Sequence, residues 1–201
     1  MEIAVSLLIG YLLGSIPFAL VIGKVFYKKD IRNYGSKNLG GGNAGRVLGK
    51  KAGLAVMTMD ILKVSFAIFL CSFMKNKDVT MVLAGLAAAI GHCFPLFARF
   101  KGGKAVATMY GFLFGMAVFG PYGLEIFFIP LITFLIVLYL GKIIAIASIC
   151  SAVVITVYIY FMGENITMFA ALLIFTVLII VRHRKNIERI MKKEENKIRW
   201  M

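Results

Sequence analysis

Residues 92–108 read HCFPLFARFKGGKAVAT, and the organisation of the whole chain can be worked out from this stretch. It leaves an apolar run, turns at Pro95 and reaches Gly102, Gly103 and Lys104 just before the next apolar run begins. A Gly-Gly-Lys turn that leads into a helix brings backbone N–H groups, a helix N-terminus and a lysine to one point. The stretch therefore predicts an anion-binding site at a membrane surface.

The composition outside this stretch is that of a membrane protein. The 201 residues are 61% hydrophobic with a mean hydropathy of +0.90, whereas soluble domains are roughly 45–50% apolar. The net charge of +14 raises the alternative of nucleic-acid binding, which we exclude because most of the chain is needed to fill a bilayer. We interpret the basic residues as topology signals and as partners of anionic head groups or phosphorylated substrates.

Seven apolar runs are candidates for spanning helices, since about 20 mostly apolar residues cross a bilayer. They cover residues 3–23, 53–74, 79–98, 104–120, 124–140, 143–162 and 166–181. The connections on one side of these runs carry twenty Lys and Arg residues and those on the other side carry two. We therefore predict an all-α integral membrane protein, a seven-transmembrane-helix bundle with its N-terminus outside and its C-terminus cytoplasmic. Residues 1–201 are expected to form one domain in the plasma membrane.

This topology places three polar-rich segments on the cytoplasmic side, residues 24–51, 92–104 and 182–190, and we expect the active site there. The first of them is a glycine-rich loop that carries Ser36, Asn38, Asn43 and Arg46. A basic cytoplasmic loop explains its lysines and arginines, but it does not explain the spacing of its serine and asparagines. An arginine binds phosphate through two parallel N–H bonds, and GxxxxGK[ST], the nucleotide-binding pattern, is missing from the loop.

Two further groups of polar residues belong to the apolar runs or their ends. Asp60 and Lys63 share a helix face, and we interpret them as a structural ion pair. Of the two histidines, His183 is the better catalytic candidate, because Asn186 lies one turn further along the same helix face and a histidine can accept a proton from an alcohol. His92 lacks the aspartate of an His-x4-Asp dyad, and we interpret it as a boundary residue.

The motifs quoted so far resemble those of one family, the bacterial membrane acyl-phosphate:glycerol-3-phosphate acyltransferases, or PlsY family. The likeness covers nearly the whole chain. Its strongest segments are GSIPFALVIGK (14–24), DIRNYGSKN (30–38), LGKKAG (48–53), DILK (60–63), GHCFPLFARFKGGK (91–104), ASI (147–149) and RHRKNIERI (182–190). The resemblance implies transfer of an acyl chain from acyl phosphate to the 1-hydroxyl of glycerol 3-phosphate without a metal or other cofactor. We expect the protein to act as a monomer.

The resemblance also implies which residues act in the reaction. The essential serine and arginine of the first family motif correspond to Ser36 and Arg46, and the essential histidine and asparagine of the third correspond to His183 and Asn186. The glycine-rich second motif, which binds glycerol 3-phosphate, corresponds to Lys101, Gly102, Gly103 and Lys104. Asn38 and Asn43 are expected to assist in substrate binding.

Five positions depart from the family pattern: Gly41, Gly42, Ala105, Ala145 and Lys185. Gly41 and Gly42 stand in a GGGN segment that usually reads GATN, and Ala105 ends a GGKA segment that usually reads GGKG. Ala145 stands in place of a serine, and Lys185 in place of an acid. Two alternatives to the acyltransferase stay open at this point, a weakly active or silent paralogue that binds lipid or phosphate and a transporter of organic phosphates.

Overall fold

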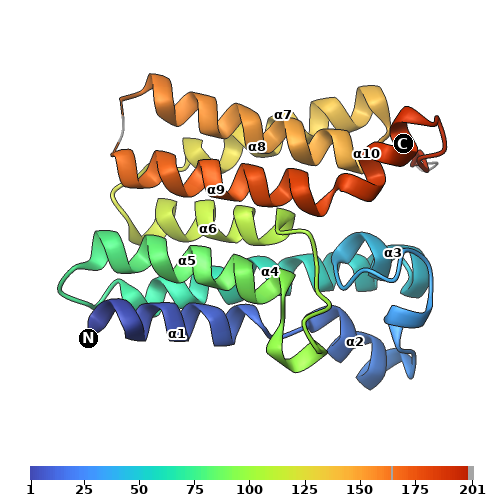
Figure 1. Ribbon diagram of the computed structural model, residues 1–201, viewed down its shortest axis with the longest axis horizontal. Helices are drawn as coiled ribbons and strands as arrows, with labels where there is room; N and C mark the ends of the chain where they lie inside the picture. Colours follow the sequence, from blue (N-terminus) through green and yellow to red (C-terminus); the bar gives the residue numbers. More distant parts are fainter. Residues whose placement is uncertain (164, 199–201) are drawn as a thin grey trace. The chain divides into compact units, whose positions relative to one another are not determined.

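A computed structural model describes residues 1–163 and 165–198 of the protein. This part of the chain contains helices, turns and loops but no strand (Figure 1). It divides into two compact units, Met1–Pro121 and Tyr122–Met201. The first unit contains α1 (Glu2–Gly14), α2 (Phe18–Tyr27), the 3-10 turn η1 (Ile31–Asn33), α3 (Gly41–Leu48), α4 (Lys50–Cys71), α5 (Lys77–Cys93), η2 (Leu96–Ala98) and α6 (Val106–Phe119). The second contains α7 (Glu125–Gly141), α8 (Ile144–Phe161), α9 (Ile166–Arg182) and α10 (Arg184–Met191).

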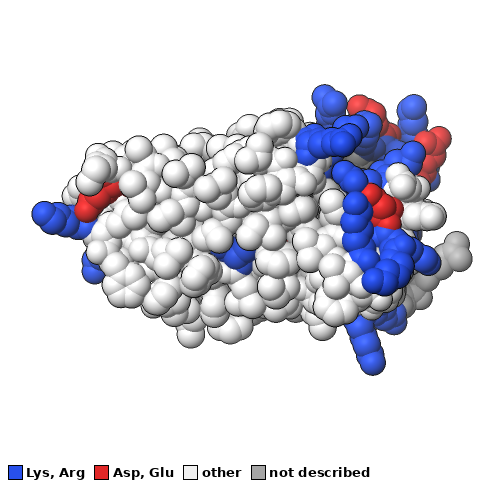
Figure 2. All heavy atoms as spheres, turned by 90° about the horizontal axis from the view of Figure 1, so that it is seen from below, with Lys and Arg blue, Asp and Glu red and all other residues white. Residues whose placement is uncertain are grey.

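Each of the seven predicted apolar runs is helical, which confirms the all-α prediction. Over residues 1–163 and 165–198, four segments are long and apolar enough to cross a membrane: Glu2–Tyr27, Lys50–Cys71, Lys77–Ala98 and Ile144–Phe161. Within the described residues, α9 and α10 make a fifth if this pair, bent by 56°, counts as one span. α6 and α7 are apolar but shorter, at 14 and 17 residues. Seen from the side of α1, basic side chains gather toward the helix ends and leave the stretch between them almost uncharged (Figure 2).

The first apolar run is broken, although it was predicted as one helix. α1 ends at Gly14 and α2 begins at Phe18, because Pro17 has no backbone N–H and cannot continue the hydrogen-bond ladder. The break leaves the carbonyl of Ile16 outside a regular helix, where it accepts a hydrogen bond from Lys63 Nζ at 2.9 Å.

Small residues let the helices of the first unit approach closely. α1 packs along α5 (Figure 1), with Gly10 and Gly14 against the backbone of Ala84 and Ala88. Lipid tails are as apolar as leucine side chains, so helices in a membrane associate through such close packing. In the second unit the contact between α8 and α9 includes polar groups. Thr156 Oγ1 and Thr176 Oγ1 lie 2.8 Å apart, and the carbonyl of Ala152 is a second acceptor within reach of both hydroxyls.

The glycine-rich segment predicted as a loop contains a helix, α3, and this part of the prediction was wrong. Glycines usually weaken a helix, but here α3 packs directly on α4. A Cβ on Gly53 would lie 2.6 Å from the Cα of Gly45 and 3.0 Å from the carbonyl oxygen of Gly41. The glycines are therefore required by the close approach of two helices, a tertiary contact that a loop assignment from composition could not include.

A further local feature is the left-handed backbone that precedes α6. Arg99, Phe100 and Ala105 have φ values of 55°, 57° and 62°, a region that costs an L-residue about 1–2 kcal/mol. Ala105 is fully buried, and its carbonyl accepts from Thr108 Oγ1 and from the N–H of Met109. At position 105, where the family pattern has glycine, the left-handed backbone favours glycine and strains the alanine found here.

We predict that Gly53→Ala destabilises the protein by about 1–3 kcal/mol, the usual cost of overpacking. Gly42→Ala is the matched control. No atom lies within 4 Å of its added Cβ, so alanine should stabilise α3 by up to about 1 kcal/mol. Thermal unfolding in detergent measures both. Equal midpoints for the two variants would contradict the close contact of α3 with α4.

We predict that Ala105→Gly raises the free energy of unfolding by about 0.5–1 kcal/mol, because relief of the left-handed strain exceeds the added chain entropy of glycine. Ala107→Gly, two residues later and inside α6, should have the opposite sign, since it places glycine in a regular helix. The same unfolding assay compares them, and a loss of stability in Ala105→Gly would show that this alanine is unstrained.

Candidate active site

Asn43 holds the backbone that carries Ser36. It is buried in α3, at 2% exposure. Its Oδ1 accepts from the N–H of Ser36 at 2.8 Å, and its Nδ2 donates to the carbonyls of Ile31 and Tyr34, both at 3.2 Å. Ser36 itself is exposed. Asn43, predicted as a substrate-binding residue, thus directs its amide into the protein and fixes the position of the serine.

A salt bridge shapes the same segment just before Ser36. Arg32 Nη2 lies 2.6 Å from Asp30 Oδ2, and Arg32 Nε donates to Asp30 Oδ1 at 2.9 Å. The hydrogen bond from Arg32 is the main cause that lowers the pKa of Asp30 to about 2. The two side chains therefore stay charged and paired at neutral pH. Arg46, by contrast, is exposed on α3, where its guanidinium can meet an anionic group.

A small apolar core packs the segment that carries Ser36 and Arg46 against the neighbouring helices of the first unit. Its seven buried members come from α2, η1, α3, α4, η2 and the chain between them: Ala19, Leu20, Ile31, Leu39, Ala44, Val56 and Ala98. The segment is therefore a packed structure, which suits the precise placement of a serine and an arginine.

The Gly-Gly-Lys turn lies directly before α6, as predicted, but one of its amides has another partner. The N–H of Gly103 donates to the carbonyl of His92 at 3.0 Å. This N–H is therefore directed at a carbonyl of the same chain. Gly102 and Gly103 are both buried, Lys104 is half-buried, and Lys101 is exposed.

His92 also belongs to a buried charged group that the sequence did not join together. Lys63 Nζ lies 2.7 Å from Asp60 Oδ1 and 3.1 Å from His92 Nδ1. The predicted ion pair of Asp60 and Lys63 is confirmed, and the histidine is a third member contributed by α5. Neither residue spacing nor composition links positions 29 residues apart on two helices.

His183 and Asn186 lie in the second unit, at the junction of α9 and α10, and both are buried, at 3% and 7% exposure. His183 Nδ1 lies 2.8 Å from the carbonyl oxygen of Ile179. Because a carbonyl oxygen only accepts, Nδ1 carries the hydrogen and Nε2 is the basic nitrogen of the neutral ring. The N–H of Asn186 donates to the carbonyl of His183 at 2.8 Å, which confirms that the two are neighbours.

Glu195 is a residue of this second site that sequence reasoning missed. Its Oε1 accepts from Asn186 Nδ2 and its Oε2 from Arg189 Nε, both at 2.7 Å. The chain reverses at Lys193, with φ 58°, and so brings the carboxylate back onto α10. The carboxylate of Glu195 therefore lies beside Asn186. The neighbouring position, where the family pattern has an acid, is occupied by the exposed Lys185. The contact between Glu195 and Asn186 could not be predicted from the sequence, because it depends on the reversal of the chain after α10.

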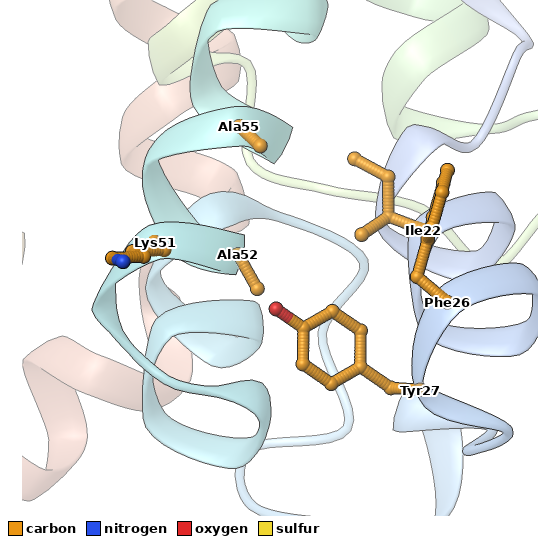
Figure 3. A pocket seen from close by; sticks show the side chains of 6 residues that line it. All are labelled: Ile22, Phe26, Tyr27, Lys51, Ala52 and Ala55. Atoms are coloured by element: carbon orange, nitrogen blue, oxygen red, sulfur yellow. The ribbon is translucent and has the colours of Figure 1, made fainter.

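Asn38 is half-buried, and Ala145 is buried in the first turn of α8. Among residues 1–163 and 165–198, no three His, Cys, Asp or Glu side chains are placed to hold a metal ion. A groove between α2 and α4 has a volume of about 410 Å³. The residues that line it are Ile22, Phe26, Tyr27, Lys51, Ala52 and Ala55 (Figure 3).

Comparison with known proteins agrees with the resemblance in the motifs. A family model described as glycerol-3-phosphate acyltransferase matches residues 4–193. The glycerol-3-phosphate acyltransferases of Geobacillus kaustophilus and Bacillus subtilis are 44% and 42% identical to this chain. The first alignment covers 98% of this chain and 96% of the relative, and the second covers 100% of both.

Two solved structures share the fold. They are crystal structures of PlsY (YgiH), an integral membrane glycerol 3-phosphate acyltransferase, in its glycerol 3-phosphate form (31% identity, TM-score 0.90) and its lysophosphatidic acid form (29%, 0.87). Each match covers 98% of this chain and 96% of the other. With a family model matched over nearly its whole length and relatives above 40% identity, this all-helical integral membrane protein belongs to the glycerol-3-phosphate acyltransferase family, the PlsY family.

Proposed function

We propose that this protein transfers an acyl chain from acyl phosphate to the 1-hydroxyl of glycerol 3-phosphate, giving lysophosphatidic acid and phosphate. The observation that carries the proposal is the match over the full length to glycerol-3-phosphate acyltransferases of known fold. The retention of Ser36, Arg46, Lys104, His183 and Asn186 at the motif positions supports it.

The chemistry requires one bond to form, one to break and one proton to move. The 1-hydroxyl oxygen attacks the acyl carbonyl carbon, the bond from that carbon to the phosphate oxygen breaks, and phosphate leaves. The hydroxyl proton passes to His183 Nε2, which is the basic ring nitrogen because Nδ1 donates to Ile179. Acyl phosphate is already activated, so the reaction needs neither a covalent enzyme intermediate nor a cofactor.

The cationic residues bind the phosphate groups of the two substrates. Lys104 binds glycerol 3-phosphate as a point charge, together with the exposed Lys101. Arg46 binds the phosphate of the acyl donor through its planar guanidinium, and the hydroxyl of Ser36 polarises the acyl carbonyl. Asn43 positions Ser36 through the bond to its N–H.

The reaction takes place at the cytoplasmic face of the plasma membrane in this proposal. We infer seven crossings, with α6 and α7 as the shorter ones, the N-terminus outside and the C-terminus in the cytoplasm. The imbalance of Lys and Arg between alternate connections supports this orientation.

We predict that the purified protein in lipid releases phosphate from acyl phosphate only when glycerol 3-phosphate is present, forms lysophosphatidic acid and does not use acyl-CoA. His183→Ala should lower turnover by about 100-fold or more, the usual contribution of a general base. The neighbouring exposed Lys185→Ala is the control and should retain wild-type turnover. A folded protein without turnover would favour the silent paralogue, and uptake of glycerol 3-phosphate into proteoliposomes would favour the transporter.

We predict that Glu195→Ala lowers kcat by about 10- to 100-fold, because Asn186 loses the acceptor that orients it and a misplacement of about 1 Å can cost about 100-fold in rate. Glu195→Gln keeps an acceptor oxygen and should recover most of the rate. Glu188→Ala, a change of an exposed acid on α10, is the control. If all three variants lose stability and rate together, Glu195 serves the fold of the tail alone.

A further inference from the structure

Lys63 is the best-satisfied charge in the interior of the first unit. Its side chain is 2% exposed. Its ammonium has three hydrogens and three close acceptors: the carbonyl of Ile16 at 2.9 Å, Asp60 Oδ1 at 2.7 Å and His92 Nδ1 at 3.1 Å. A buried lysine in a membrane helix is retained only when it is paired in this way, and such groups mark functional regions.

The contact with Lys63 decides which nitrogen of His92 carries the hydrogen. An ammonium group donates and cannot accept, so Nδ1 of His92 must offer its lone pair to Lys63. The ring is then neutral, with its hydrogen on Nε2. Asp60 Oδ1 lies 3.6 Å from His92 Nδ1. The Asp60 carboxylate balances the charge of Lys63, whose ammonium contacts both side chains.

The other edge of the His92 ring lies against the Gly102-Gly103-Lys104 turn. A Cβ on Gly103 would collide with His92 Nε2 and would lie 2.6 Å from Cε1 and 2.8 Å from Cδ2. The backbone of the same histidine accepts the N–H of Gly103. Glycine is thus required at position 103 because the imidazole fills the space where a side chain would begin.

We propose that His92 is a positioning residue of the Gly102-Gly103-Lys104 turn, and that Asp60 and Lys63 hold it as the Nε2–H tautomer with that hydrogen toward the turn. Through these contacts the position of the turn before α6, which carries Lys104, depends on the positions of α4 and of the break between α1 and α2. The consequence for glycerol 3-phosphate binding rests on the proposed function, whereas the tautomer and the packing do not.

The tautomer can be tested in the protein itself, because the chain has only two histidines. The geometry assigns them opposite forms, Nε2–H for His92 and Nδ1–H for His183. Nitrogen-15 NMR of histidine-labelled protein in lipid distinguishes a protonated ring nitrogen from a lone-pair nitrogen, and the His183→Gln variant identifies the signals of His92. The double variant Asp60→Asn/Lys63→Met, which removes both charges together, should release His92 from the Nε2–H form. A His92 found as Nδ1–H in the unmodified protein would overturn the proposal.

The packing can be tested by a cycle of substitutions. Gly103→Ala should raise KM for glycerol 3-phosphate by about tenfold or more, since the turn must move away from the ring. His92→Ala should also raise KM, and the double variant should be no worse than His92→Ala alone, because the colliding ring is gone. Gly102→Ala is the control. Its Cβ would meet the carbonyls of His92 and Cys93 and the ring of Pro95, so His92→Ala should not rescue it.

Thermal midpoints of the same variants keep the test independent of activity. If the protein proves to have no acyltransferase activity, the proposed function fails, but the rescue of Gly103→Ala by His92→Ala must still appear in the midpoints. Independent effects of the two substitutions on both KM and midpoint would overturn the positioning role of His92. An effect on midpoint with unchanged KM would reduce His92 to a structural residue and overturn it as well.

Discussion

The three hydrogen bonds of the Lys63 ammonium join α4 to the break between α1 and α2 and to the end of α5. They reach the carbonyl freed by Pro17, the carboxylate one turn back on α4 and the imidazole at the end of α5. Removing one partner of a buried pair costs about 3–5 kcal/mol, because the other charge is left unpaired. The break in the first apolar run, the register of α4 against α5 and the turn after α5 therefore depend on one another.

Close backbone contacts are the second constraint on the first unit. α1 meets α5 at Gly10 and Gly14, and α3 meets α4 at Gly45 and Gly53. In a membrane, helix association comes from packing at short range, so a single added methyl group at such a contact changes the arrangement. The glycine-rich segment before α4 is thus closely packed on that helix, and Ser36 and Arg46 lie exposed on this packed segment.

The departures from the family pattern have different physical meanings. Gly41 and Gly42 are part of α3, and one of them is in the contact with α4. Ala105 adopts a left-handed backbone that glycine would adopt without strain. Lys185 points away from the buried side of α10, and the carboxylate of Glu195 occupies the place beside Asn186. The tail thereby provides an acid that the motif itself lacks.

The sequence by itself determined the helical class, the positions of the apolar helices, the family and the motif residues, because these depend on local composition and on short spacings. It also identified the pair Asp60–Lys63 and the neighbours His183 and Asn186, which lie within one turn of a helix. Only the tertiary structure decided that α3 is a helix, that Asn43 faces inward to hold Ser36, and that His92 lies between Lys63 and Gly103. It alone brought Glu195 to Asn186. These contacts join residues from different helices or from a reversed tail, and their energies arise only when the helices pack.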